Sequence, residues 1–188
     1  ISHPKKGLIK FDTFPFQDEC IKEFESHRFN IVLKSRQLGL STICAGYCLW
    51  LALFQKEKNI VVLATRLDVA KNFLRKVLTM YDSLPDWVVL PKEKGRTVKS
   101  IEFSNGSRIT AVPTGDDAGR GEGISLLIVD EAAHIQGFDE LWMGLYSTVS
   151  TGGNIILLST PKGVGNVFHK TWMGCDMEKK DNDFHGIK

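Results

Sequence analysis

Four short runs of apolar residues stand out along the chain, at positions 30–33, 59–63, 125–129 and 154–158. Each run is rich in Ile, Val and Leu and is nearly free of polar residues. That composition is typical of strands covered on both faces, because a strand with one face in water alternates apolar and polar residues. We therefore expect these runs to be the central strands of a largely parallel sheet.

The segments between these runs have a helical period. Residues 40–54 are almost wholly apolar, and in residues 68–81 apolar side chains recur at every third or fourth position. Residues 100–112 differ, since their pattern alternates around the turn sequence Ser104, Asn105 and Gly106, which predicts an antiparallel hairpin attached to the sheet.

Strands that alternate with helices predict an α/β fold with a largely parallel central sheet flanked by helices. We expect residues 1–174 to form one domain of this kind. After Gly174 the chain becomes polar and mixed in charge. We therefore expect residues 175–188 to be a polar tail that leads toward a lid or nuclease domain outside this chain.

The composition agrees with one globular domain: of 188 residues, 43% are apolar, 10% aromatic and 24% charged. Disordered, collagenous and coiled-coil classes are excluded. There is no apolar stretch of about 20 residues and no apolar core of a signal peptide, so we expect no membrane segment and a soluble protein that is not secreted.

The cysteines Cys20, Cys44, Cys48 and Cys175 include no CxxC pair, and no histidine follows at zinc-finger spacing. Cys44 and Cys48 stand four residues apart on an apolar helix. We therefore expect them to pack in the core of a protein kept in a reducing cytoplasm.

The net charge of +2 is small, but it is distributed unevenly: residues 56–99 hold ten Lys or Arg and five acids, and residues 100–145 hold two and eight. The basic segment 56–99 is either an ordinary surface exposed to solvent or a surface that binds nucleic acid. The candidates for DNA contact are Arg66, Lys71, Arg75 and Lys76.

A phosphate-binding loop is predicted where the run 30–33 meets the helix 40–54. The loop consists of Lys34, Ser35, Arg36, Gln37, Leu38, Gly39, Leu40, Ser41 and Thr42. In the usual P-loop, backbone N–H groups surround the phosphates, a lysine before the Ser/Thr neutralises them, and the hydroxyl binds Mg²⁺. Leu40 stands where that lysine is expected. Because the loop curls round the phosphates, Lys34 at its other end is our candidate for the missing charge, with Arg36 as a second.

The run 125–129 ends in two adjacent acids, Asp130 and Glu131. An apolar strand with this ending is typical of a Walker B segment, in which the first carboxylate reaches Mg²⁺ and the next polarises a water for attack on the γ-phosphate. Loop and acids together predict a P-loop NTPase of the ASCE type that uses ATP and Mg²⁺. We expect His134, three residues on, to be structural.

Three further positions are candidates. Arg120, between Gly119 and Gly121, is placed to act as an arginine finger on a neighbouring subunit's nucleotide. Ser159 and Thr160 end the fourth strand, where hydroxyls can contact the γ-phosphate or its water. Gln17 precedes the first strand by about one helix and is a candidate for an adenine contact.

As a set, these segments resemble the ATPase domain of the large terminase subunit of tailed bacteriophages, and the resemblance covers nearly the whole chain. Some members of that family also carry the lysine at the beginning of the loop, as Lys34 does. The resemblance implies an ATP-driven motor that binds the portal protein of an empty capsid as a ring, expected to be a pentamer, and pumps in double-stranded DNA. It also implies a small terminase subunit as a partner, a place in the host cytoplasm at the procapsid portal, and a monomer in dilute solution.

The resemblance also implies roles for single residues. Gln17 would contact adenine, Lys34 and residues 39–42 would cradle the phosphates, and Ser41 with Asp130 would bind Mg²⁺. Glu131 would be the catalytic carboxylate and Arg120 the finger, although Arg36 acting within its own subunit is an alternative. Ser159 and Thr160 would couple hydrolysis to movement. We expect no nuclease activity, because the acids after Thr160 lie in a polar segment without the strands that would array them.

Two other functions remain open. A superfamily 2 helicase also has an Asp-Glu pair followed by Ala and His, but helicases keep the loop lysine that Leu40 replaces. A non-hydrolysing nucleotide-binding assembly module would explain the displaced lysine, but it would have no use for Glu131.

Overall fold

The computed structural model describes residues 2–3, 5, 7–85, 87–88, 90–115, 123–149, 152–175 and 181–188. Within these residues a sheet of eight strands has the order β10-β3-β9-β8-β4-β7-β6-β5. The four predicted central strands are β3 (Phe29–Leu33), β4 (Asn59–Ala64), β8 (Leu126–Asp130) and β9 (Asn154–Ser159). They are parallel and lie side by side in the order β3-β9-β8-β4, which confirms the prediction.

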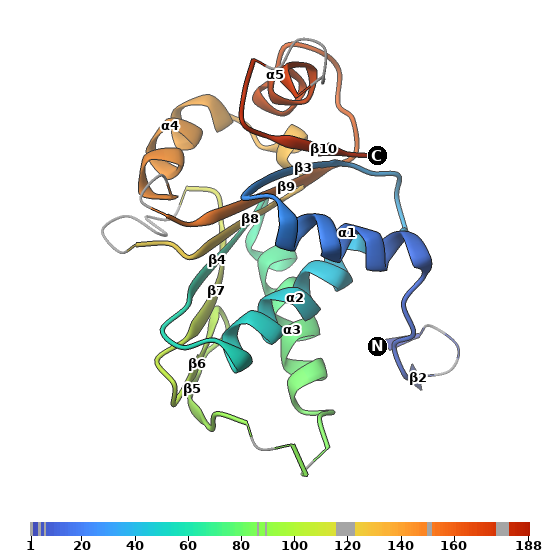
Figure 1. The fold of residues 1–188 in the computed structure, drawn as a ribbon, viewed down its shortest axis with the longest axis vertical. Coiled ribbons are helices and arrows are strands. Elements are labelled where there is room, and N and C mark those ends of the chain that lie inside the picture. Colours follow the sequence, from blue (N-terminus) through green and yellow to red (C-terminus); the bar gives the residue numbers. More distant parts are fainter. Residues whose placement is uncertain are drawn as a thin grey trace.

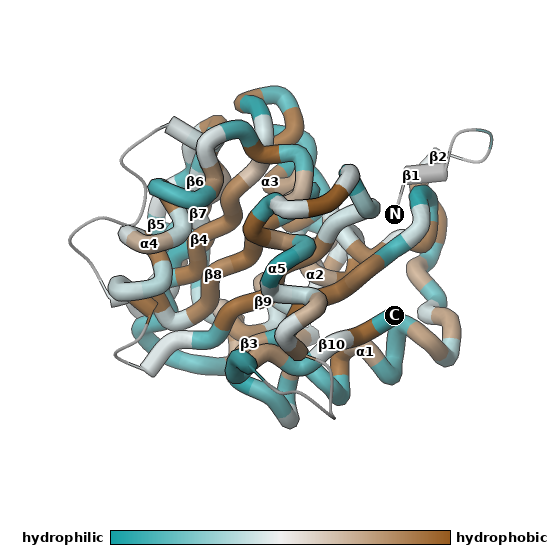
Figure 2. The backbone as a smooth tube through the Cα atoms, turned by 90° about the horizontal axis from the view of Figure 1, so that it is seen from above, coloured by the Kyte–Doolittle hydropathy of each residue, from teal (hydrophilic) through white to brown (hydrophobic). Residues whose placement is uncertain are grey.

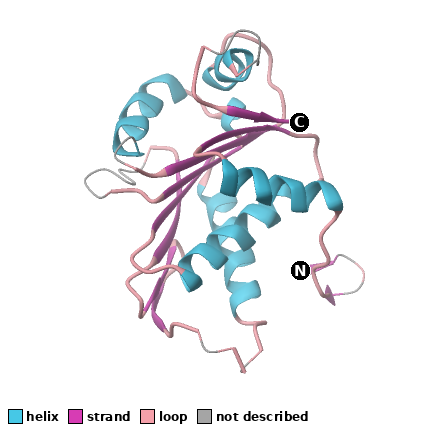
Figure 3. Ribbon diagram, in the orientation of Figure 1, coloured by secondary structure: helices cyan, strands magenta, loops and turns pink. Residues whose placement is uncertain are grey.

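Helices cover both faces of this sheet (Figures 1 and 3). On one face lie α1 (Pro15–Ser26), α2 (Leu40–Phe54) and α3 (Leu67–Tyr81); on the other lie α4 (Phe138–Val149), α5 (Val167–Gly174) and the 3₁₀ helix η1 (Ala132–His134). The predicted helices at 40–54 and 68–81 are confirmed as α2 and α3. None of the helices in the described part of the chain is long and apolar enough to cross a bilayer.

The core is divided into two layers by the sheet. Alternate residues of a strand point to opposite faces, so Val62 joins the cluster under α1–α3 while Val61 joins the cluster under η1, α4 and α5. This arrangement is why the central strands have apolar residues at successive positions, visible as brown strands in Figure 2. The double coverage predicted from the apolar runs is therefore confirmed.

The expected hairpin is formed by β6 (Ser100–Phe103) and β7 (Arg108–Pro113), which are antiparallel. Its turn contains Gly106 at φ +82°, a conformation that favours glycine. The hairpin is attached through β7, which pairs in parallel with β4. A polar strand, β5 (Glu93–Arg96), adds to the edge at β6; its sequence EKGR carries no strand pattern, so we did not predict it.

The domain extends into the segment expected to be a tail. Strand β10 (His185–Ile187) pairs in parallel with β3 and forms the other edge of the sheet. Three residues in a polar segment are too few to carry a strand pattern. They form a strand because the backbone of β3 pairs with them. That this segment leads to another domain stays a prediction. Near the N-terminus, β1 (Ser2–His3) and β2 (Gly7–Leu8) form a separate antiparallel pair.

Candidate nucleotide-binding site

The loop predicted to bind phosphate leaves β3 at Leu33 and enters α2 at Leu40. It leads from the carboxyl edge of the sheet into the amino end of a helix, where unpaired backbone N–H groups favour anions. Gly39 precedes α2 at φ +71°, and a Cβ at this position would lie 2.8 Å from Nε2 of Gln17. Both the backbone conformation and the closeness of Gln17 therefore favour glycine here.

Gln17 is 2% exposed and joins α1 to this loop. Its Nε2 donates to the carbonyl oxygen of Leu38 over 2.8 Å, and its Oε1 accepts from the backbone N of Phe14 over 3.0 Å. The side chain thus holds the loop from the helix before β3, a contact that the sequence pattern does not predict. The adenine contact stays a prediction, and Nε2 has a second hydrogen for it.

Lys34 lies between the two acids of the strand end. Its Nζ is 2.9 Å from Oε1 of Glu131 and 3.3 Å from Oδ1 of Asp130, and its side chain is 9% exposed. Burial lowers the pKa of this ammonium, but the charges and hydrogen bonds of Asp130 and Glu131 outweigh burial and raise the pKa above its ordinary value. The loop's first cation is thus held, charged, at the acid pair.

Asp130 is held from the opposite side by α2. Oγ of Ser41 donates to its Oδ2 over 2.7 Å, while Oδ1 accepts from the backbone N of Glu131 over 3.0 Å. The register of the sheet creates this contact, because Asp130 of β8 pairs with Leu158 of β9 at the same edge where β3 ends. Two oxygen donors suited to Mg²⁺ are therefore adjacent.

Glu131 follows β8 in a left-handed conformation at φ +56°, unusual for a residue with a side chain. Its Oε2 lies 3.3 Å from Oγ1 and 3.4 Å from the backbone N of Thr160, both of which donate to it. Burial raises the pKa of this carboxyl, but the Lys34 ammonium and the Thr160 donors reverse the effect, so the pKa is lowered. Glu131 is consequently ionised at neutral pH.

The hydroxyl residues at the end of β9 differ in their surroundings. Ser159 is fully buried, and its Oγ accepts from the backbone N of Ala133 over 3.1 Å, which fixes the start of η1. Thr160 turns toward Glu131, and its Oγ1 also lies 3.0 Å from Nε2 of His134. A chain of contacts therefore runs from Glu131 through Thr160 to His134.

Comparisons with known proteins identify the family of the chain. Residues 31–184 match the family model described as the N-terminal part of the terminase large subunit, T4likevirus type. The chain belongs to this family.

Solved structures of phage terminases have a similar fold. The large terminase of bacteriophage HK97 is 18% identical with a TM-score of 0.78, over 98% of this chain and 40% of that chain. The ATPase domain of the large terminase of Thermus phage P74-26 is 18% identical with a TM-score of 0.73, over 94% and 80%. The large terminase of another thermophilic bacteriophage, in complex with ATP-γ-S, is 12% identical with a TM-score of 0.70, over 94% and 45%.

The likeness shows that the chain has the P-loop fold of terminase ATPase domains. The chain spans less than half of the HK97 terminase and less than half of the terminase solved with ATP-γ-S.

The remaining loop residues surround this centre without joining its ion pairs. Ser35, Arg36, Gln37 and Leu38 are exposed, and Thr42 in the first turn of α2 is half-buried. Arg120, with Gly119 and Gly121, lies outside the described residues. The choice between Arg120 and Arg36 as arginine finger is therefore still open.

The four cations proposed for DNA contact do not share one environment. Arg66, Lys71 and Arg75 are exposed at the start and along the outside of α3. Lys76 is half-buried, and burial lowers its pKa; Asp130 and Lys34 are among the charges that act on it. The charge of Lys76 is thus coupled to those of Asp130 and Lys34, and its contact with DNA stays a prediction.

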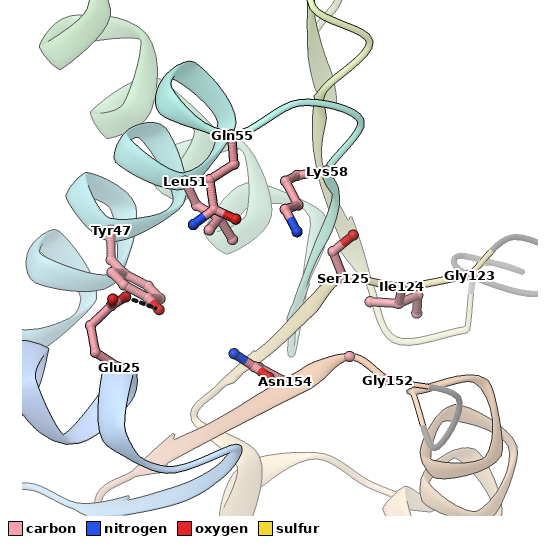
Figure 4. A pocket seen from close by; sticks show the side chains of 11 residues that line it. Glu25, Tyr47, Leu51, Gln55, Lys58, Gly123, Ile124, Ser125, Gly152 and Asn154 are labelled. Carbon is pink, nitrogen blue, oxygen red and sulfur yellow. Dashed lines mark hydrogen bonds between the residues drawn. The ribbon is translucent and has the colours of Figure 1, made fainter.

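Two hollows lie at opposite ends of the parallel strands. One, of about 450 Å³, is beside the phosphate loop and is lined by Phe16, Leu38, Leu40 and Ile187 among others. The other, of about 460 Å³, lies at the amino ends of β8 and β9, where Lys58 and Asn154 direct nitrogen atoms into it (Figure 4). Because the acid pair follows the carboxyl end of β8, only the first hollow adjoins the candidate site.

Proposed function

We propose that the chain is the ATPase module of a viral DNA-packaging motor, which hydrolyses ATP to move double-stranded DNA into a procapsid. Membership of the terminase large-subunit family implies a role in phage DNA packaging. The observation that carries the proposal is the contact of Lys34 with Asp130 and Glu131, together with Ser41 bonded to Asp130. This set supplies the charge, metal ligands and base that phosphoryl transfer needs.

Mg²⁺ would be held by Ser41 and Asp130. These two residues fit Mg²⁺, because both offer oxygen atoms and their hydrogen bond of 2.7 Å keeps those atoms next to each other. When bound, Mg²⁺ neutralises negative charge on the phosphates and polarises the γ-phosphoryl group.

Lys34 would supply the positive charge that Leu40 cannot supply. In the free chain its ammonium is neutralised by Asp130 and Glu131. Phosphate oxygens would compete with the two carboxylates for this ammonium, so nucleotide binding would turn Lys34 from the acids to the phosphates. The same step would release Oε1 of Glu131 for a water molecule.

Glu131 would be the general base. Its lowered pKa keeps it ionised, and Thr160 holds Oε2 while Oε1 is exchanged between Lys34 and water. A movement of Glu131 would therefore shift Thr160 at the end of β9. Ser159, the residue before it, holds η1 in place. This is the route by which hydrolysis would couple to movement.

The adenosine would lie in the hollow between α1, the phosphate loop and β10, where Phe16, Leu38 and Ile187 offer apolar surface. Gln17 at its edge would contact the base while it holds Leu38. Arg120 would complete the site of the next subunit in a ring, expected to be a pentamer, on the portal protein, with the small terminase subunit as a further partner.

The test is ATP hydrolysis by this chain over a range of protein concentrations, with Glu131→Gln, Arg120→Ala and Arg36→Ala beside it. We expect Glu131→Gln to bind ATP and to lose at least about a hundredfold in kcat, since it retains the shape but not the base. If Arg120 acts on a neighbour, the specific rate rises with concentration and Arg120→Ala removes that rise. A rate that is independent of concentration and depends on Arg36 would move the finger into the same subunit.

Two outcomes would contradict the proposal. ATP binding without hydrolysis in the presence of Mg²⁺, DNA and the portal protein would favour the assembly module. Strand separation of a forked duplex would favour the helicase, because a packaging motor moves along duplex DNA without opening it.

A further inference from the structure

Three side chains meet where α1 passes the edge strand β10, and two of them, Glu23 and His185, line the hollow beside the phosphate loop. They are Glu23 in the last turn of α1, His27, which caps the carboxyl end of α1, and His185, the first residue of β10. Oε2 of Glu23 lies 3.1 Å from Nδ1 of His27 and 2.9 Å from Nε2 of His185. A single carboxylate oxygen thus stands between two imidazole nitrogens that come from elements far apart in sequence.

Hydrogen bonding leaves one nitrogen of this cluster without a partner. Nδ1 of His27 is buried and makes no hydrogen bond, although Oε2 of Glu23 is 3.1 Å away. The two imidazole rings stack with centroids 3.8 Å apart and planes 5° from parallel. A buried imidazole nitrogen thus stands beside a carboxylate oxygen without a hydrogen bond of its own.

The spacing of these donors suits a metal ion. The three ligand atoms all lie within 4.8 Å of one another. In a tetrahedral zinc site with bonds of about 2.0–2.1 Å, neighbouring ligand atoms are about 3.3 Å apart, close to the two measured distances here. Glu23 in the last turn of α1 and His27 at its C-cap already bring their ligand atoms to 3.1 Å, so the end of this helix can offer both to the same ion.

We propose that Glu23, His27 and His185 bind a divalent transition-metal ion, with Zn²⁺ as the best match and water as the fourth ligand. Metal binding would require the two rings to turn out of their stacked, parallel arrangement, so that both nitrogen lone pairs point to the common centre. Two imidazoles and one carboxylate favour zinc, cobalt or nickel over magnesium, which prefers oxygen ligands. This site would therefore be distinct in chemistry from the oxygen site of Ser41 and Asp130.

The ion would link α1 to β10. Both elements line the hollow beside the phosphate loop, and α1 also carries Gln17, which holds Leu38. A metal crosslink here would fix the edge strand against the helix that supports the loop. We therefore expect metal binding to stabilise the fold, which can be measured without any ATPase assay.

The test is calorimetric titration of the full chain, stripped with a chelator, with Zn²⁺ in the presence of excess Mg²⁺. We expect one ion per chain and a rise in Tm when it binds. His27→Ala and His185→Ala should each weaken binding by at least about tenfold, since even residues that only orient a ligand cost 10- to 100-fold. Co²⁺ should give the visible absorption of a tetrahedral complex in the parent chain and not in the two histidine variants.

Matched controls separate this site from casual zinc binding. Cys175 is a half-buried thiol and His169 lies on α5, so Cys175→Ser and His169→Ala should bind Zn²⁺ like the parent chain. Glu23→Gln keeps the side-chain shape and tests the ligand even if a histidine variant fails to fold. No saturable binding, or binding that survives loss of either histidine or of Glu23's charge, would overturn the proposal, as would binding that disappears with Cys175.

Discussion

The ammonium of Lys34 and the carboxylate of Glu131 lie 2.9 Å apart although 97 residues separate them in the chain. Sheet order brings them together, because β3 and β8 flank β9 and all three end at one edge. The proposed base and the proposed phosphate-binding cation thus neutralise each other in the free chain. Activation would require an anion that takes Lys34 away.

Loss of Lys34 should abolish efficient hydrolysis. We expect Lys34→Ala to lower kcat/KM by at least about a hundredfold, comparable to the loss of one donor to transition-state charge. Adding Leu40→Lys to this variant restores a lysine at the usual loop position and should recover part of the rate. Steady-state kinetics with a nucleotide-binding assay would measure both, and unchanged ATP affinity in Lys34→Ala would contradict the role of Lys34.

The ion pair should shape the pH dependence of stability. The pKa of Glu131 is lowered, so its contribution is present above its unfolded value of about 4.3 and is lost as pH falls through the folded value. The pKa of Lys34 is raised, so its contribution is present below about 10.4 and is lost as pH rises through the folded value.

Urea unfolding of the parent chain and of Lys34→Met/Glu131→Gln over a pH series would test this dependence. The difference in unfolding free energy between the parent chain and the double variant should be constant between about pH 4.3 and about pH 10.4. It should shrink at lower and at higher pH. Curves that stay parallel through both limits would contradict the coupling.

Gly39 and Gln17 should be energetically coupled. Gly39→Ala adds left-handed strain of about 1–2 kcal/mol and a Cβ 2.8 Å from Nε2 of Gln17. Gln17→Ala loses hydrogen bonds worth about 1 kcal/mol each but removes the atom that Cβ would meet. The double variant should therefore be less destabilised than the sum of the single variants, as measured by urea unfolding in a double-mutant cycle. Strictly additive effects of the two substitutions would show that Gln17 moves away from the new Cβ at no energetic cost.

Thr160 should affect turnover more than substrate binding. Thr160→Val keeps the side-chain shape and the backbone donor but removes the hydroxyl bonded to Glu131, so we expect kcat to fall about 10- to 100-fold with KM nearly unchanged. His134→Gln should have a smaller effect in the same direction, because Nε2 of His134 lies 3.0 Å from Oγ1 of Thr160 but 3.9 Å from Oε2 of Glu131. A larger effect of His134→Gln than of Thr160→Val would show that this chain of contacts has the wrong order.

The cations of α3 should divide into two groups in a DNA-binding assay. Lys71→Gln and Arg75→Gln should each reduce the salt dependence of duplex binding by about one phosphate contact. Lys76→Gln should change that slope less, because this ammonium is half-buried while Lys71 and Arg75 are exposed. An equal effect of all three variants would show that Lys76 contacts DNA as Lys71 and Arg75 do.

Much of the fold was predictable because its patterns are local. Strands buried on both faces need successive apolar residues, and α2 and α3 need an apolar face or core, so their bounds were correct to within a residue or two. Strands β5 and β10 escaped prediction since they are short, polar and defined by the partner strand beside them.

The sequence alone determined which residues are candidates for phosphate, metal and water chemistry, because a loop and an acid pair at strand ends are local features. Only the tertiary structure decided which of them meet. The pairing of Lys34 with Glu131, the anchoring of Leu38 by Gln17 and the approach of His185 to Glu23 depend on strand order and helix placement. Contacts across 97, 21 and more than 150 residues leave no local pattern, since the packing of the whole sheet fixes them.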